Sequence, residues 1–225
     1  MSSKSFSFTK RLARHSVKTE YDDLPSEVVQ QTKRIILDML GCALGGSLTD
    51  TGRIAIAVTK ELGGIPESTV LGSGHRTACT HAAYANARMG NILDAEETYY
   101  TNTHFGSPAI FAALALCEHK SASGKDFITA TVVGFDLAAR TAMTIGNPFM
   151  SEDKTTPDPE RYTISDDLIF SAVGSAGKVL GLDEKQMCHA IGIAGANAPL
   201  KSRYIMAMQR GKTPHFKYGD RKSVV

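Results

Sequence analysis

The chain has 225 residues, enough to bury a substantial hydrophobic core in one large domain or two small ones. This length excludes the class of small peptides that need disulfides or a bound metal to fold. Its 25 basic and 23 acidic side chains give a formal net charge of +2, without the clustered basic face that is typical of nucleic-acid binding. The slight positive balance fits an anionic small ligand, although an ordinary protein surface explains it equally well.

The four cysteines, Cys42, Cys79, Cys117 and Cys188, are widely separated and form no CxxC pair, which indicates reduced thiols. No stretch is long and apolar enough to span a bilayer, and the first residues lack the apolar core of a secretion signal. We therefore expect a cytoplasmic protein. The residues before Glu20 are basic and contain no acid, as in a mitochondrial transit peptide, so the mitochondrial matrix is the alternative location. An amphipathic first helix explains the same composition.

Two helices and a short extended piece are predicted in the first third of the chain. The first helix covers residues 23–46, with Asp23 as its N-cap, Pro25 in its first turn and apolar residues at helical spacing. A second apolar helix covers residues 51–62. Residues 68–71 then favour a short extended piece between turns.

The middle of the chain predicts closely packed helices. Residues 80–91 are rich in alanine, and residues 108–119, which follow Ser107, are apolar nearly all round, as in a helix at the centre of a domain. Residues 123–143 have a similar character. Their threonine and valine content makes a buried strand the competing prediction.

The last third begins with residues 147–161, which are polar and hold three of the eight prolines, a pattern that favours a long surface loop. Asp166 or Asp167 is expected to cap the next helix, and Asp183 a further one. The chain then stops at two valines without a capping residue, so it is expected to end inside an element. The predicted fold class is all-α, or mostly so.

Chemically active side chains gather between two of the predicted helices, within the stretch LDAEETYYTNTH: Asp94, Glu96, Glu97, Thr98 and His104. A carboxylate that is partly removed from water has a raised pKa, and histidine titrates near neutrality, so this mixture suits proton transfer. A solvated acidic loop with one surface histidine explains the same composition.

Motifs for metals and cofactors are missing from the sequence. There is no HExxH and no DxDxDG, and the spacing of Asp94, Glu97 and His104 matches no zinc or calcium loop. The nucleophile elbow GxSxG, the phosphate loop GxxxxGK[ST] and a glycine-rich dinucleotide turn are also absent. We predict a protein without metal or organic cofactor.

Five stretches, in order between residues 21 and 140, resemble landmarks of the MmgE/PrpD family, which includes 2-methylcitrate dehydratase and cis-aconitate decarboxylase. YDDLPSEVVQQTKRIILDMLGCALGG is similar to the family's opening DLPxxV and the helix after it, and TVLGSG to its next landmark. AAYANARMGNILDAEET, HFGSPAIFAALALCEH and GFDLAAR match the following three. The resemblance implies the family's large helical amino-terminal domain, here over residues 1–225, truncated at its carboxyl end and lacking the family's second, α/β domain.

The resemblance also implies a set of site residues. Cis-aconitate decarboxylases carry a catalytic Asp, Thr and His at relative positions 0, +4 and +10, which Asp94, Thr98 and His104 reproduce. An active-site lysine that precedes a glycine is matched best by Lys217, with Lys212 a weaker candidate. Two departures fall at the expected substrate pocket, where Asn91 replaces a histidine and Glu97 an aspartate.

We therefore expect a lyase that dehydrates or decarboxylates a small di- or tricarboxylic acid, or an epimerase or isomerase of a related acid. His104 would be the general acid or base, Asp94 its partner or the opposing base, and Thr98 a hydrogen-bond donor; Lys217 would anchor a substrate carboxylate, beside Asn91 and Glu97.

Two alternatives remain at this stage. The first is a truncated, non-catalytic helical scaffold that associates with itself. The second is a helical binding protein for an anion, with Arg140, Lys201 and Arg203 as contacts. The expected partners are a small anionic carboxylic acid and a second copy of the chain in a homodimer, with neither nucleic acid nor membrane.

Overall fold

The computed structural model describes residues 7–99, 103–145 and 168–198. These residues form helices joined by short connections and one small hairpin, which confirms the predicted mostly α fold. The elements are α1 (Phe8–Lys18), η1 (Tyr21–Asp23), α2 (Ser26–Ser47), α3 (Asp50–Leu62), β1 (Ser68–Thr69), β2 (Arg76–Thr77), α4 (Cys79–Asn91), α5 (Gly106–Lys120), α6 (Gly124–Ile145), α7 (Leu168–Leu180) and α8 (Glu184–Asn197). The two strands pair antiparallel, with Ser68 opposite Thr77.

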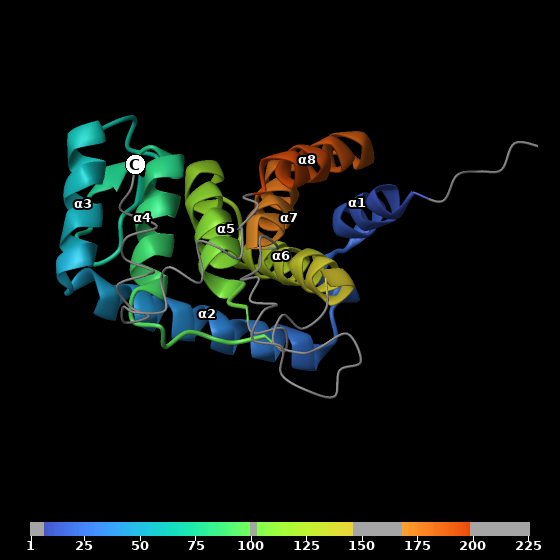
Figure 1. The fold of residues 1–225 in the computed structure, drawn as a ribbon, viewed down its shortest axis with the longest axis horizontal. Helices are drawn as coiled ribbons and strands as arrows, with labels where there is room; N and C mark the ends of the chain where they lie inside the picture. Colours follow the sequence, from blue (N-terminus) through green and yellow to red (C-terminus); the bar gives the residue numbers. More distant parts are fainter. Residues whose placement is uncertain (1–6, 100–102, 146–167, 199–225) are drawn as a thin grey trace, which may run out of the picture.

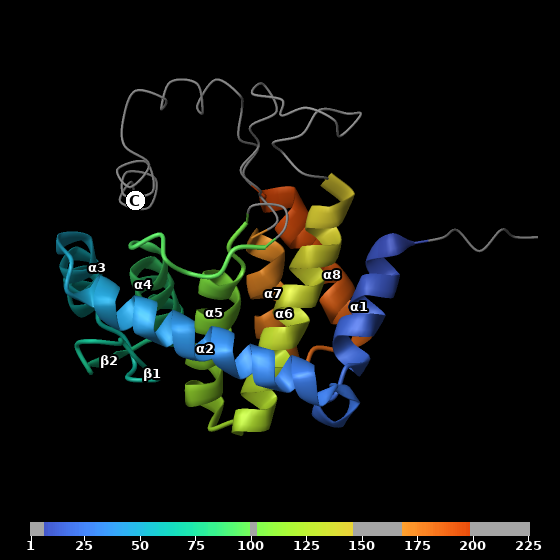
Figure 2. The same ribbon diagram turned by 90° about the horizontal axis from the view of Figure 1, so that it is seen from below.

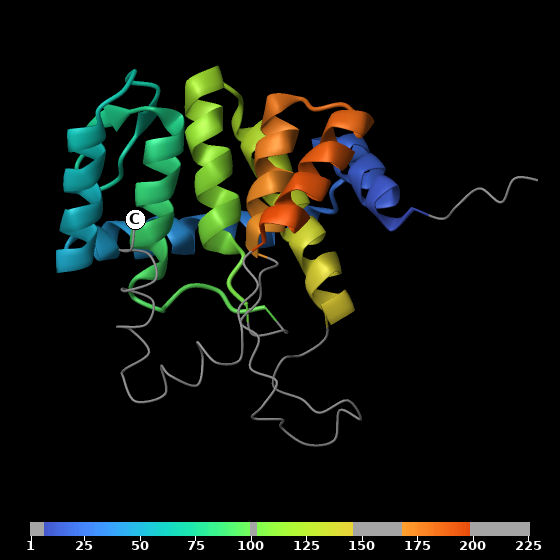
Figure 3. The ribbon, with the colours of Figure 1, turned by 45° about the horizontal axis from the view of Figure 1, so that its top comes forward.

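Helix α2 runs across a row of other helices (Figure 1). It contacts α3, α4, α5 and α6, and the view from below shows it passing in front of α4 and α5 (Figure 2). The row runs from α3 at one end to α1 and α8 at the other (Figure 3). There α1 packs against α8, so the first and last described helices meet. None of the described helices has the length and apolar character needed to cross a membrane.

Helix α2 begins later than the sequence predicts. The carboxylate of Asp23 was expected to cap it, but its Oδ2 accepts the backbone N–H of Glu20 at 3.0 Å and closes the separate turn η1. Pro25 takes the N-cap position instead, and the helix starts at Ser26. The predicted cap was wrong because a nearer backbone donor, three residues upstream, occupies the same carboxylate.

The predicted helix over residues 123–143 is confirmed as α6, and the competing strand is not formed. Its threonines are accommodated because the hydroxyls of Thr129 and Thr131 donate to carbonyls four residues earlier, at 2.9 and 2.8 Å. The predicted cap of α8 is also confirmed. Asp183 and Gln186 form a reciprocal capping box there, each side chain accepting the other residue's backbone N–H.

Helices α6 and α7 approach each other through small residues. A Cβ added to Gly134 of α6 would lie 2.1 Å from Ser175 Oγ of α7, so glycine is needed for this contact. The Ser175 hydroxyl donates to the carbonyl of Ala130 at 3.0 Å, which satisfies its polar group inside the core.

The core has three clusters of buried side chains. The largest joins α2, α4 and α5 around Met39, Met89 and Phe111. A second joins α1, α6, α7 and α8. The third is centred on Phe105, just ahead of α5, which packs against Ala138 and Ala142 of α6. This last cluster fixes the carboxyl end of the α4–α5 connection, where the chemically active side chains lie.

Some predicted features lie outside the described residues: the loop 147–161, the caps Asp166 and Asp167, and the cationic residues Lys201, Arg203, Lys212 and Lys217.

Candidate active site

The connection between α4 and α5 carries the three predicted catalytic residues, Asp94, Thr98 and His104. It runs beside α2 on one side of the helical row (Figures 1 and 2). Among the described residues, the side chains of Asp94 and Thr98 are exposed and that of His104 is half-buried. All three belong to one short segment because they lie within eleven residues of the sequence.

Asp94 adopts a backbone conformation that is unusual for a residue with a side chain. Its φ is +53°, in the left-handed region that favours glycine and that aspartate and asparagine tolerate best among other residues. Its N–H donates to the carbonyl of Asn91 at 3.3 Å, at the end of α4. A residue held in this region turns the chain sharply and presents its side chain away from the helix, to solvent.

His104 is oriented by the main chain. Its Nδ1 lies 2.8 Å from the carbonyl oxygen of Glu97, and the backbone N–H of Tyr99 donates to the carbonyl of Thr103 at 2.7 Å. The ring of Phe105, which follows, packs at a tilt against Tyr99, with 5.2 Å between ring centres, and meets Phe135 of α6 edge-on at 6.1 Å. The imidazole therefore has a defined place on a segment that is anchored by its neighbour.

Two of the predicted substrate-binding residues make contacts inside the chain. The Asn91 side chain is buried at the end of α4, and its amide donates to Glu96 Oε1. The Glu97 carboxylate faces the start of α5, where its Oε1 accepts the Gly106 N–H at 2.6 Å. The third, Lys217, lies outside the described residues.

The Glu97 carboxyl sits in a space that exists because residue 106 is glycine. A Cβ at that position would lie 2.3 Å from Glu97 Oε2 and 3.0 Å from Met39 Cγ. Burial, against the opposing effect of the Gly106 and Phe105 N–H groups and with a smaller contribution from the charges of Glu96 and Asp38, raises the pKa of Glu97 from its ordinary value of 4.5 to about 7. The Oε2 atoms of both Glu96 and Glu97 are buried without a hydrogen-bond partner in the described structure. Sequence reasoning missed this buried acid pair.

The raised pKa of Glu97 predicts how stability changes with pH. Between about pH 4.5 and 7 the unfolded chain releases this proton while the folded chain keeps it, so the free energy of unfolding falls as the pH rises. The fall attributable to Glu97 is roughly 3 kcal/mol, at about 1.4 kcal/mol per pKa unit. Glu97→Gln, which resembles the neutral acid, should remove that fall.

The measurement is urea unfolding of the wild type and Glu97→Gln from pH 4.5 to 8. Glu27→Gln, at an exposed site in the first turn of α2, is the matched control and should keep the wild-type profile. Parallel profiles for wild type and Glu97→Gln would show that the Glu97 carboxyl titrates normally in the folded chain.

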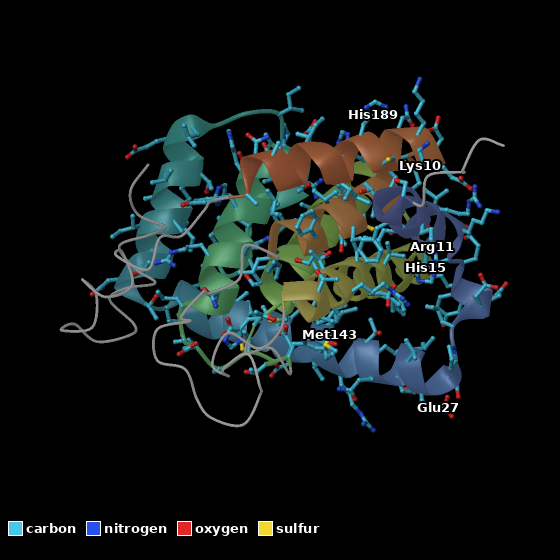
Figure 4. All side chains as sticks on the ribbon, turned by 45° about the vertical axis from the view of Figure 1, so that its right-hand side comes forward. Lys10, Arg11, His15, Glu27, Met143 and His189 are labelled. Carbon is cyan, nitrogen blue, oxygen red and sulfur yellow. The ribbon has the colours of Figure 1, made fainter. Side chains whose placement is uncertain are left out.

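A separate groove of about 880 Å³ lies between α1, α6 and the ring of Tyr99. Figure 4 labels Arg11 and His15 of α1 and Met143 of α6, three of the residues that line it. Arg140, an expected anion contact, also lines it, but its guanidinium donates to Asp136 at 2.7 Å, and the same carboxylate oxygen lies 2.8 Å from His15 Nε2. The basic side of this groove is therefore partly neutralised, and the three predicted catalytic residues are not in its lining.

The protein is a row of helices in which the connection between α4 and α5 carries an acid, a hydroxyl and an imidazole, from Asp94, Thr98 and His104. The family model of the MmgE/PrpD N-terminal domain matches residues 10–222, and the chain belongs to this family. Cis-aconitate decarboxylase of Aspergillus terreus is 28% identical over 187 residues, covering 79% of this chain and 36% of that protein. The human cis-aconitate decarboxylase is 29% identical over 184 residues, covering 78% and 36%.

The mouse cis-aconitate decarboxylase is similar at a comparable level, 27% identical over 193 residues, covering 82% of this chain and 37% of that protein. The chain thus spans little more than a third of the length of the curated relatives that it matches. The family resemblance inferred from sequence landmarks is confirmed, and these relatives are lyases by name.

Proposed function

We propose that this chain supplies the helical wall of the active site of a lyase that dehydrates or decarboxylates a small di- or tricarboxylic acid. The observation that carries the proposal is the α4–α5 connection, which presents Asp94, Thr98 and His104 from one anchored segment. Membership of the MmgE/PrpD family and the names of the relatives support the same class of reaction. An epimerase or isomerase of a related acid belongs to this class as well.

In the proposed reaction, His104 passes the proton. In a dehydration it protonates the departing hydroxyl, or removes the proton next to a carboxylate with Asp94 in the opposite role. In a decarboxylation it protonates the carbon that loses carbon dioxide. The exposed Thr98 hydroxyl donates a hydrogen bond to the substrate, and Asn91 and Glu97 form the pocket floor beneath.

We further propose Lys217 as the anchor for a substrate carboxylate, because an ammonium group is a compact cation that suits a carboxylate. Residues 1–225 would then form one amino-terminal domain. No metal or organic cofactor is needed for proton transfer of this kind.

Self-association is the second candidate property. In the part of the chain that the structure describes, large apolar side chains are exposed on the outer side of α2 and next to α3, among them Leu37 at 72%, Leu48 at 75% and Ile65 at 72%. Exposed apolar patches often mark surfaces that bind another protein. A homodimer would cover them, either in a working lyase or in a scaffold without activity.

The test is a panel of citrate-like acids, incubated with the chain and with any longer form that its gene encodes. Ultraviolet absorbance follows new C=C bonds, and a carbon dioxide assay separates decarboxylation from dehydration. We expect turnover of at least one di- or tricarboxylate. If neither form changes any acid while sedimentation shows a dimer, the scaffold alternative replaces the lyase.

A further inference from the structure

The hydrogen bond between His104 and the Glu97 carbonyl determines which ring nitrogen of His104 carries the proton. A carbonyl oxygen carries no hydrogen and can only accept, so the 2.8 Å contact between His104 Nδ1 and the Glu97 carbonyl requires a hydrogen on Nδ1. In the neutral ring the other nitrogen, Nε2, then carries the lone pair. Which nitrogen holds the proton decides which one can act as a base.

The Glu97 residue is held at both of its polar ends. Its main-chain carbonyl accepts from His104, while its side-chain Oε1 accepts the Gly106 N–H at 2.6 Å, two residues beyond the histidine. The segment between them is closed by the Tyr99–Thr103 backbone pair. The Glu97 side chain thus fixes the position of residue 97 relative to the start of α5, and the carbonyl of the same residue holds the imidazole of His104.

Stability alone does not account for this arrangement. The Glu97 Oε2 atom is buried without a hydrogen-bond partner among the described residues, and such a group normally costs free energy. The start of α5 also has no room for a side chain at residue 106, since a Cβ there would meet this carboxyl. A buried acid that costs free energy calls for an explanation other than stability, and its neighbour His104 offers one.

We propose that Glu97 is a positioning residue for His104: by bonding the start of α5 it aims its own carbonyl at Nδ1, and so leaves Nε2 as the atom that takes and gives the substrate proton. This inference rests on the proposed function for the meaning of Nε2, but the tautomer itself is a property of the folded chain. It adds a role on the histidine to the place of Glu97 in the proposed pocket floor.

The tautomer is measured by nitrogen-15 NMR of the protein labelled at histidine, at a pH where the imidazoles are neutral. We expect His104 to show a protonated Nδ1 and an unprotonated Nε2. His189, exposed on α8 and labelled in Figure 4, is the internal reference for a solvent-facing ring. A His104 with its proton on Nε2 would overturn the proposal.

Two variants separate positioning from mere packing. Glu97→Ala should lower the Nδ1–H population of His104 severalfold, toward that of His189, whereas Glu97→Gln should retain it because the amide oxygen accepts the same Gly106 N–H. Circular dichroism confirms that both are folded. An unchanged tautomer in folded Glu97→Ala, or its loss in folded Glu97→Gln, would contradict the role of Oε1.

Activity supplies an independent readout. In the active protein, Glu97→Ala should lower kcat about 10-fold or more with little change in KM, and Glu97→Gln should restore most of it. If the tautomer changes as expected in the variants but neither the chain nor a longer form turns over any acid, the proposed lyase function fails while the positioning inference stands.

Discussion

His104→Gln should lower turnover by at least about 100-fold, within the range of about 100- to 10,000-fold that general acid–base catalysis contributes. Glutamine cannot exchange a proton near neutral pH, yet its amide can still donate to the Glu97 carbonyl that now holds the imidazole at 2.8 Å. The fold should therefore survive, with an unfolding midpoint close to that of the wild type.

The matched control is His81→Gln. His81 is also half-buried, and its Nδ1 also contacts a backbone carbonyl, that of Gly63 at 3.2 Å, but it lies in the first turn of α4, at the opposite end from the candidate site. Initial rates on the best acid of the panel should be unchanged in this variant. Equal losses in His81→Gln and His104→Gln would indicate a general structural effect, and full activity in His104→Gln would remove it from the mechanism.

Gly46→Ala should destabilise the fold by roughly 3–5 kcal/mol, more than the usual cost of about 1–3 kcal/mol for overpacking. A Cβ at Gly46 would lie 2.0 Å from the backbone oxygen of Met89 and 2.8 Å from Ile92 Cγ2, and backbone atoms cannot move aside cheaply. The contact joins α2 to the end of α4, only a few residues before Asp94. Its loss should therefore disturb the candidate site as well.

Gly41→Ala, in the same helix, is the control for Gly46→Ala. No atom lies within 4 Å of a Cβ added at Gly41, so alanine should raise the free energy of unfolding by up to about 1 kcal/mol, through its better helix propensity. Chemical denaturation of both variants gives the comparison. Similar stability changes in the two would mean that α2 and α4 do not meet at Gly46.

Local patterns located most helices because their signals lie within a few residues. Asp183 caps α8 as predicted, since its partner Gln186 is three residues away. The same rule failed at Asp23, whose carboxylate bonds Glu20 behind it and not the helix ahead. A capping residue with donors on both sides is ambiguous in sequence, and only the folded turn decides.

The candidate site was located by spacing but not by geometry. The positions of Asp94, Thr98 and His104 follow from the family resemblance, and the structure places all three on one connection. The inward turn of Glu97 could not be predicted, because its partner Gly106 lies nine residues ahead and the space that it occupies also depends on Met39 of α2. The one available signal was a glycine at the start of an otherwise largely apolar helix.

The groove between α1 and α6 was also beyond sequence reasoning. It arises from the packing of helices more than 100 residues apart, and the contact of His15 with Asp136 depends on that packing, whereas the pair of Asp136 with Arg140 lies within α6. The sequence shows the i, i+4 spacing of Asp136 and Arg140, but not that His15 of α1 meets the same carboxylate.

The central claim is that the α4–α5 connection moves a proton to or from a carbon next to a carboxylate. The most direct measurement is deuterium incorporation into the acid during turnover in deuterated water, followed by NMR for the wild type and His104→Gln. A decarboxylation should leave deuterium on that carbon of the product. A reversible dehydration should introduce deuterium into the pool of substrate acid as the reaction nears equilibrium. In either case, incorporation should be at least about 100-fold slower in His104→Gln. Incorporation at the same rate in His104→Gln, or a decarboxylation whose product carries no deuterium on carbon, would contradict the claim.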